Sequence, residues 1–121
     1  MLIPREGVLL RIFLGEKDRH EGEALYDWIV RSARARGLAG ATVLRGIEGY
    51  GANSHLHTAT ILRLSTDLPI VVEIVDAAEK IEAFVDEIGD AIGGGMITME
   101  RVQVRVYRAG GERRRGEGNG G

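Results

Sequence analysis

The stretch Ile70–Ile92, IVVEIVDAAEKIEAFVDEIGDAI, contains a strand and a helix in immediate succession. Its first part, Ile70–Val75, is dominated by β-branched side chains and predicts a strand. Asp76 and Glu79 then stand three residues apart, which predicts a capping box at the start of a helix. The apolar stripe of that helix has helical spacing and consists of Ile81, Phe84, Val85, Ile88 and Ile92.

The same succession of strand and helix occurs earlier in the chain. Val8–Leu14 alternates, with Leu10, Ile12 and Leu14 on one face of a predicted strand and Leu9, Arg11 and Phe13 on the other. From Ala24 the period becomes helical, and Gly37 stands where a C-terminal cap is expected. The stripe of this earlier helix consists of Leu25, Trp28, Ile29, Ser32 and Arg36. Trp28 and Phe84 are therefore expected to pack in the core.

Further strands are predicted at Ala41–Ile47, at Ala59–Leu64 and at Met96–Tyr107, the last of them after a glycine stop at Gly93–Gly95. The order β-α-β then occurs twice, which predicts an α+β fold, the ferredoxin-like βαββαβ sandwich. Its antiparallel four-stranded sheet would carry both helices on one face. We expect one domain over residues 1–108, followed by a flexible tail rich in glycine and arginine over 109–121.

Both faces of the first strand and of Ile70–Val75 are largely apolar, although the predicted helices cover only one face. A sheet that is apolar on both sides needs cover on both sides. We therefore expect a homo-oligomer whose open sheet faces pack together, and a closed ring of three chains would achieve this.

Composition excludes several classes of function. The chain has 121 residues, a net charge of −2 and no cysteine, so disulfides and thiolate metal sites are excluded. The balanced charge argues against non-specific nucleic-acid binding. No apolar run approaches the length that spans a bilayer, and the start MLIPREG does not have the pattern of a signal peptide. The expected location is the cytoplasm.

The stretch Leu44–Thr60, LRGIEGYGANSHLHTAT, is the most unusual part of the chain. Three glycines lie within six residues, and several together indicate special backbone angles or a close approach. Loops of this kind on a rigid scaffold often carry binding groups. No nucleophile elbow, P-loop or dinucleotide fingerprint accompanies it. The sequence therefore favours a ligand-binding or signalling loop, and we do not expect an enzyme.

The pattern from GATVLRGIEGYGANSHLHTA to LPIVVEIVD, with the opening LLRIFLGEKDRHEGEALYDWIV, resembles the PII-like proteins of domain-of-unknown-function family 190. This resemblance covers about residues 7–108. A more distant one is to the PII nitrogen-signalling proteins, through Arg45-Gly46, Gly49–Gly51, the glycine loop Ile92–Ile97 and Arg105. In PII proteins these elements meet at subunit interfaces and hold an adenine nucleotide, and the large loop docks on a membrane transporter or an enzyme.

The resemblance implies a set of ligand-binding residues: Arg45, Gly49, Tyr50, Gly51, Asn53, Gly93, Gly94, Gly95, Met96 and Arg105. An arginine fork can grip a phosphate or a carboxylate, although Arg45 and Arg105 could instead pair with Glu73 or Glu100. Gly93–Gly95 could offer backbone N–H groups to a phosphate, or could serve only as a helix stop and tight turn. The small glycine loop of PII proteins usually has an acidic residue and a lysine. Here Gly94 and Met96 stand in that loop.

These observations predict a PII-like signalling protein that binds a small effector, an adenine nucleotide, and regulates a partner through its 48–58 loop. Genes of the resembled family often lie near a fluoride-export membrane protein, so the implied partner is a transporter or channel. No other cofactor is expected. One alternative is a divalent-metal-binding trimer of the copper-tolerance type, which would use His55 and His57, with His20 as a third ligand. The other alternative is an interaction module without a ligand.

Overall fold

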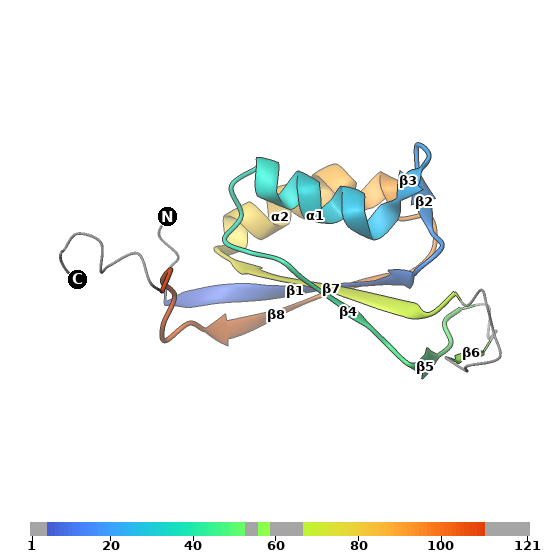
Figure 1. The fold of residues 1–121 in the computed structure, drawn as a ribbon. Coiled ribbons are helices and arrows are strands. Elements are labelled where there is room, and N and C mark those ends of the chain that lie inside the picture. Colours follow the sequence, from blue (N-terminus) through green and yellow to red (C-terminus); the bar gives the residue numbers. More distant parts are fainter. Residues whose placement is uncertain (1–4, 53–55, 59–66, 111–121) are drawn as a thin grey trace.

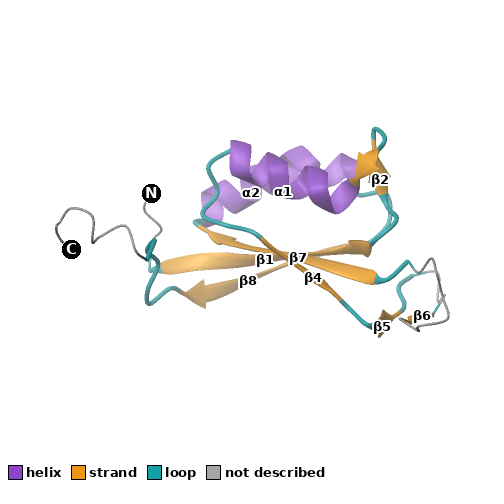
Figure 2. Cartoon of the chain, in the orientation of Figure 1, coloured by secondary structure: helices purple, strands orange, loops and turns teal. Residues whose placement is uncertain are grey.

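The computed structural model describes residues 5–52, 56–58 and 67–110. Its main sheet has four strands in the order β4-β7-β1-β8, and all neighbours are antiparallel. The strands are β1 (Glu6–Gly15), β4 (Thr42–Arg45), β7 (Pro69–Asp76) and β8 (Met96–Gln103). Helices α1 (Leu25–Ala35) and α2 (Ala78–Ile88) lie side by side on one face of this sheet (Figures 1 and 2). This arrangement confirms the predicted ferredoxin-like sandwich.

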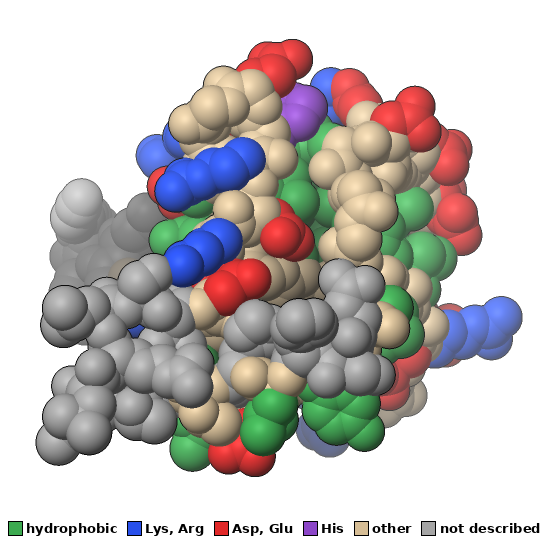
Figure 3. Space-filling model, turned by 90° about the vertical axis from the view of Figure 1, so that its right-hand side faces the viewer, with side chains coloured by type: hydrophobic (Ala, Val, Ile, Leu, Met, Phe, Trp, Pro, Cys, Tyr) green, Lys and Arg blue, Asp and Glu red, His purple; other side chains and the backbone are tan. Residues whose placement is uncertain are grey.

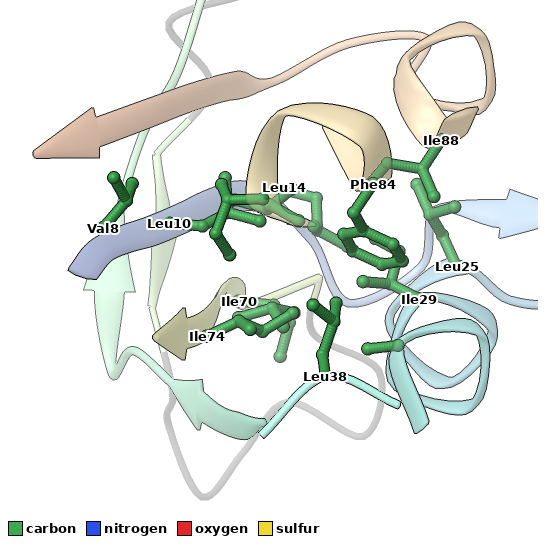
Figure 4. Close-up of a cluster of buried hydrophobic side chains, with 14 residues drawn as sticks. Val8, Leu10, Leu14, Leu25, Ile29, Leu38, Ile70, Ile74, Phe84 and Ile88 are labelled. Atoms are coloured by element: carbon green, nitrogen blue, oxygen red, sulfur yellow. The ribbon is translucent and has the colours of Figure 1, made fainter. Parts of the chain in front are cut away.

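The core lies between the sheet and the two helices. Alternate side chains of the central strands, such as Leu10, Ile12 and Val72, are completely buried. Phe84 of α2 projects into the same cluster and is 2% exposed, as predicted (Figure 4). Trp28 packs against the edge of the cluster and is only partly buried. Strand alternation thus directs one face of the sheet toward the helices.

Helix α1 ends in a Schellman motif, which confirms the predicted role of Gly37. The Gly37 N–H donates to the carbonyl of Arg34, and the Leu38 N–H donates to that of Ala33, each at 3.1 Å. Gly37 has a φ of +77°, the left-handed conformation that such a cap requires. The predicted stripe was partly wrong. The buried positions of α1 are Leu25, Ile29 and Ala33. Ser32 is only half-buried, while Arg36 is exposed and forms an ion pair with Glu87.

The capping box predicted at Asp76 and Glu79 was wrong. Asp76 is the last residue of β7 and is 1% exposed. Its Oδ1 accepts from the Ala77 N–H at 2.7 Å and its Oδ2 from the Ala39 N–H at 2.8 Å. The helix begins one residue after Ala77 with no side-chain cap bond. This carboxylate therefore joins the end of β7 to the connection between α1 and β4, because a buried carboxylate must find donors.

A small hairpin between β1 and α1 was not predicted. It consists of β2 (Arg19–His20) and β3 (Glu23–Ala24), joined by the two residues Glu21 and Gly22. Their φ values of +51° and +87° are those of a type I′ turn, which matches the twist of a hairpin. The His20 ring lies against the Trp28 ring of α1, with the centroids 4.1 Å apart.

The last strand is shorter than predicted, because β8 ends at Gln103 and not at Tyr107. The chain then turns toward the connection between α1 and β4, where the Tyr107 hydroxyl donates to the carbonyl of Ala39 at 2.6 Å. Strand β4 is also shorter than the predicted Ala41–Ile47. The strand predicted at Ala59–Leu64 and residues 111–121 of the predicted tail lie outside the described residues. Within the described part of the chain, no helix is long and apolar enough to cross a membrane.

Candidate ligand-binding site

The candidate residues lie at two opposite ends of the sheet. The loop end is the end at which β1 and β4 finish and β7 and β8 begin. Register places it there, because Gly15 pairs with Pro69, Phe13 with Met96, and Arg45 with Ile70. The hollow end is the opposite end, where β8 and β7 finish. The glycine-rich stretch after β4 and the glycines before β8 both belong to the loop end.

Two glycines of the stretch after β4 are required by the ring of Pro69. The Gly46 N–H donates to the Pro69 carbonyl at 2.7 Å. A Cβ on Gly46 would lie 2.9 Å from Cγ of Pro69, and one on Gly49 would lie 3.1 Å from it. Gly51 has open space around it. The first two glycines therefore let the chain wrap closely around Pro69, and Gly51 alone has no packing explanation.

Beyond this turn the chain forms a two-stranded ladder, with β5 (Glu48–Gly49) against β6 (His57–Thr58). Large apolar side chains around it face solvent: Ile47 is 79% exposed, Tyr50 71% and Leu56 59%. Exposed apolar side chains in one projecting segment are typical of a surface that contacts a partner. Among the described residues, the Tyr50 ring contacts no other aromatic ring.

Arg45 ends β4 and is 55% exposed in its side chain. Its Nη2 donates to Oε2 of Glu16 at 2.6 Å. The predicted partners Glu73 and Glu100 instead accept from Arg11, each at 3.0 Å. The alternative in which Arg45 pairs with one of these two carboxylates is therefore wrong, because Arg45 pairs with Glu16. Figure 3 views the loop end, where basic side chains lie beside acidic ones.

The three glycines before β8 differ from one another. Gly95 has a φ of +144°, and a Cβ there would overlap the carbonyl oxygen of Phe13, so the fold itself requires glycine. A Cβ on Gly93 or on Gly94 would meet no atom within 4 Å, and both residues are exposed. Met96 follows on the sheet face away from the helices and is 53% exposed. The backbone of Gly93 and Gly94 is thus accessible to a ligand, while Gly95 has a structural role.

Arg105 lies at the hollow end, beside an open hollow of about 740 Å³. One wall is the segment 39–42, which Asp76 holds through Ala39, and the opposite wall is the segment 102–107. The floor includes Leu9 of β1 and Glu73 of β7. Arg105 was predicted from the sequence, whereas the segment 39–42 was not. The only signal for that segment was a glycine, Gly40, directly before the strand.

A single chain does not bring the predicted residues together. Strand β8, with eight residues at about 3.3 Å each, separates Met96 from Arg105 by roughly 25 Å. Asn53 and His55 lie outside the described residues, and only the backbone of His57 is described. Among the residues that the structure describes, no three His, Asp or Glu side chains are grouped closely enough to hold a metal ion. The metal alternative at His55 and His57 stays a prediction.

Known structures share this architecture. CPII from Thiomonas intermedia K12, bound to ADP and bicarbonate, matches with a TM-score of 0.64 and 14% identity, over 85% of this chain and 95% of that one. A PII-like protein from Thermus thermophilus matches at 0.60 and 16%, over 82% and 89%. CutA1 from Oryza sativa matches at 0.52 and 10%, over 85% and 84%. At such identities the likeness establishes the fold, which is that of PII-like proteins.

The chain belongs to the family described as DUF190 (Uncharacterized ACR, COG1993), whose profile matches residues 7–104. Two relatives agree with this assignment. A UPF0166 protein from Aquifex aeolicus is 44% identical over 96 residues, which is 79% of this chain and 90% of the relative. A UPF0166 protein from Methanocaldococcus jannaschii is 38% identical over 101 residues, or 83% and 91%. The predicted resemblance to this family is confirmed.

Proposed function

We propose that this protein is a PII-like signalling protein that binds an adenine nucleotide between the subunits of a homo-oligomer, with no catalytic step of its own. Two findings support the proposal. The fold is that of CPII, whose structures contain ADP, AMP and bicarbonate. The glycine turn before β8 and the hollow beside Arg105 both offer accessible groups to a ligand.

The proposal of a shared site rests on the distance between two groups of candidate residues. Gly93 and Gly94 precede β8 at the loop end, and Arg105 follows β8 at the hollow end. A ligand the size of a nucleotide cannot reach from Gly93 and Gly94 to Arg105 within one chain. It can contact both when the loop end of one subunit lies against the hollow end of another. In that arrangement Arg45, Tyr50 and the glycines come from one subunit. Arg105 and the segment 39–42 come from its neighbour.

The sheet face away from the helices supplies the surface for such an assembly. We call it the open face. Its side chains are apolar at most positions and only half-buried or exposed: Leu9, Phe13, Leu44, Val71, Val75, Met96 and Val102. A single chain leaves this apolar area in contact with water, which costs free energy in proportion to the area. Association through the open face, in a closed ring of three chains, removes it from water.

The regulated partner would read the segment that projects from the loop end. Ile47, Tyr50 and Leu56 offer an apolar docking surface there, and Arg45 connects it to the effector site. A membrane transporter or channel is the partner class we propose. Effector binding would change how this segment is held, which is the usual way in which a bound ligand alters a docking surface.

The test is calorimetry of the full chain with ADP, AMP and ATP, together with the Arg105→Ala variant. Losing a charge-assisted bond to phosphate should weaken ADP binding by about 1.5–3 kcal/mol. Arg101→Ala is the matched control, since Arg101 is an exposed arginine of β8, four residues before Arg105, and does not line the hollow. Absence of binding by all three nucleotides would refute the proposed effector. An equal loss in both variants would remove Arg105 from the site.

A further inference from the structure

The turn between β1 and β2 fastens both ends of the segment that projects from the loop end. Arg45 stands where that segment begins, and Asp67 and Leu68 stand where the chain returns to β7. The Glu16 carboxylate holds Arg45 at 2.6 Å, and the Glu16 N–H donates to the Leu68 carbonyl at 2.9 Å. The Lys17 N–H donates to Oδ1 of Asp67 at 2.8 Å. One short turn therefore contacts both ends of the segment.

Close packing keeps this turn in place. The Gly15 N–H donates to Oδ2 of Asp18 at 3.0 Å, so the turn is closed by its own side chain. A Cβ on Gly15 would lie 2.9 Å from Oδ1 of Asp67, so a glycine allows the Asp67 carboxylate to approach. Hydrogen bonds from backbone N–H groups thus link the turn to Asp67 and Leu68, where the projecting segment returns to β7. Its link to Arg45, where the segment leaves β4 as the outgoing chain, is a side-chain ion pair.

That ion pair differs in exposure between its two members. The Glu16 side chain is 24% exposed, whereas the Arg45 side chain is 55% exposed. Glu16 contacts the guanidinium through one oxygen and one nitrogen, Nη2. Arginine has five N–H donors in a planar fork, and a phosphate or carboxylate can take two of them in parallel. An external anion can therefore approach Arg45 from solvent and bind it with better geometry than Glu16 does.

We propose that Glu16 is an internal competitor that occupies Arg45 until the anionic group of the effector replaces it. This inference rests on the proposed function, in which Arg45 belongs to the effector site. The ligand chemistry is that of a planar or tetrahedral oxyanion, a phosphate or a carboxylate. An uncharged nucleoside has no group that competes with Glu16.

Displacement of Glu16 also explains how effector binding reaches the docking surface. When an anion takes Arg45, the side-chain tie between the turn and the outgoing chain is lost. The ties of Glu16 and Lys17 to Leu68 and Asp67 are backbone-donated and remain. The start of the projecting segment, with Ile47 and Tyr50, is then held by the ligand and no longer by the turn. Its orientation thus depends on whether the site is occupied.

The experiment compares the full chain with its Glu16→Gln variant. Glutamine keeps the length of the side chain and removes the charge that competes for Arg45. Glu87→Gln is the matched control, because the exposed carboxylate of Glu87 pairs with Arg36 and not with Arg45. Calorimetry measures the affinity for ADP, inorganic pyrophosphate and adenosine. Thermal unfolding confirms that each variant is folded.

Glu16→Gln should bind ADP and pyrophosphate about two- to fivefold more tightly than the original chain, the range for an exposed ion pair. Adenosine binding should not change, and Glu87→Gln should behave as the original chain does. Adding Arg45→Gln to Glu16→Gln should remove the gain. If ADP binds both proteins equally, the competition is refuted while the proposed function stands.

The experiment can also support the competition by Glu16 while refuting the adenine-nucleotide effector. Tighter pyrophosphate binding by Glu16→Gln, with no ADP binding by either protein, would support the competition and refute the adenine-nucleotide effector. If neither pyrophosphate nor ADP binds to any variant, Arg45 does not bind an external anion and the competition is refuted as well.

Discussion

The two faces of the central sheet differ although the same strands supply both. On the helix-covered face, Leu10, Ile12 and Val72 are completely excluded from water. On the open face, Leu9, Val71 and their neighbours are only half-buried. The first face explains why one chain folds. The second face leaves apolar surface uncovered in one chain, which supports the proposed assembly through the residues that alternate with the core.

The largest difference in stability between the two faces should appear when the two phenylalanines of the chain, one on each side of the sheet, are replaced. Phe84→Ala removes a ring that is 2% exposed and should lower the free energy of unfolding by about 3–5 kcal/mol. Phe13→Ala, on the open face, should cost clearly less in dilute protein and more as concentration and association increase. Urea unfolding at several protein concentrations measures both. Equal, concentration-independent losses would contradict the distinction between the faces.

The second prediction concerns a charge placed in the middle of the open face. Leu9→Asp should prevent association, because burying an unpaired carboxylate in an apolar interface is strongly unfavourable. The folded chain should survive, since Leu9 does not point into the core. Light scattering after gel filtration gives the oligomeric state, with Ala35→Asp on the exposed side of α1 as control. An unchanged assembly in Leu9→Asp would show that the open face is not the interface.

The third prediction concerns Asp76, the buried carboxylate that holds one wall of the hollow. Asp76→Asn replaces a buried carboxylate whose oxygens accept from Ala39 and Ala77. Asparagine retains only one acceptor, so the free energy of unfolding should fall by about 1–3 kcal/mol. Hydrogen exchange should increase at Ala39, in the segment that forms one wall of the hollow. Unchanged protection at Ala39 would show that Asp76 does not hold this wall.

The smallest effect is expected from the charged centre of the open face, where Arg11 lies between Glu73 and Glu100. The hydrogen bond to Glu73, and the charges of both carboxylates, raise the pKa of Arg11 above its usual value. A raised pKa contributes stability below the ordinary value, which is lost only as pH rises through the higher one. Arg11 therefore stays charged at every pH near neutrality. The difference in free energy of unfolding between the original chain and Arg11→Gln should not change through titration of Arg11 in that range. Urea unfolding of both chains across that range measures it. A change that follows deprotonation of Arg11 near neutral pH would contradict this account.

The sequence was sufficient for the fold wherever a local period decides structure. The alternation of Leu10, Ile12 and Leu14 and the stripe of α2 each follow from which side must leave water, so β1, α2 and the alternation of the main strands with the two helices were predictable. The β2–β3 hairpin was missed because its turn depends on Glu21 at a positive φ, which a glutamate rarely adopts. Gly22 alone did not reveal it.

Partners distant in the sequence were not predictable in the same way. Glu73 and Glu100 were suggested as alternative partners of Arg45 or Arg105. Sheet register instead pairs Glu73 with Arg11 and places Glu100 diagonally across from Arg11, and both carboxylates accept from it. Asp76 was interpreted as a helix cap, because nothing local shows that Ala39 offers it an N–H group. Arg45 was correctly placed on a strand, but its partner Glu16 lies 29 residues earlier. Local spacing could identify these side chains as candidates and could not pair them.

In the proposed assembly, each effector site takes one half from the loop end of one subunit and the other half from the hollow end of its neighbour. Mixed oligomers test it directly. Arg45→Ala and Arg105→Ala chains are each measured alone by calorimetry with ADP, then unfolded together, refolded as a mixture and measured again. We expect each variant alone to bind ADP weakly and the mixture to regain a fraction of sites with the original affinity. A mixture that binds ADP no better than the separate variants would contradict a site shared between subunits.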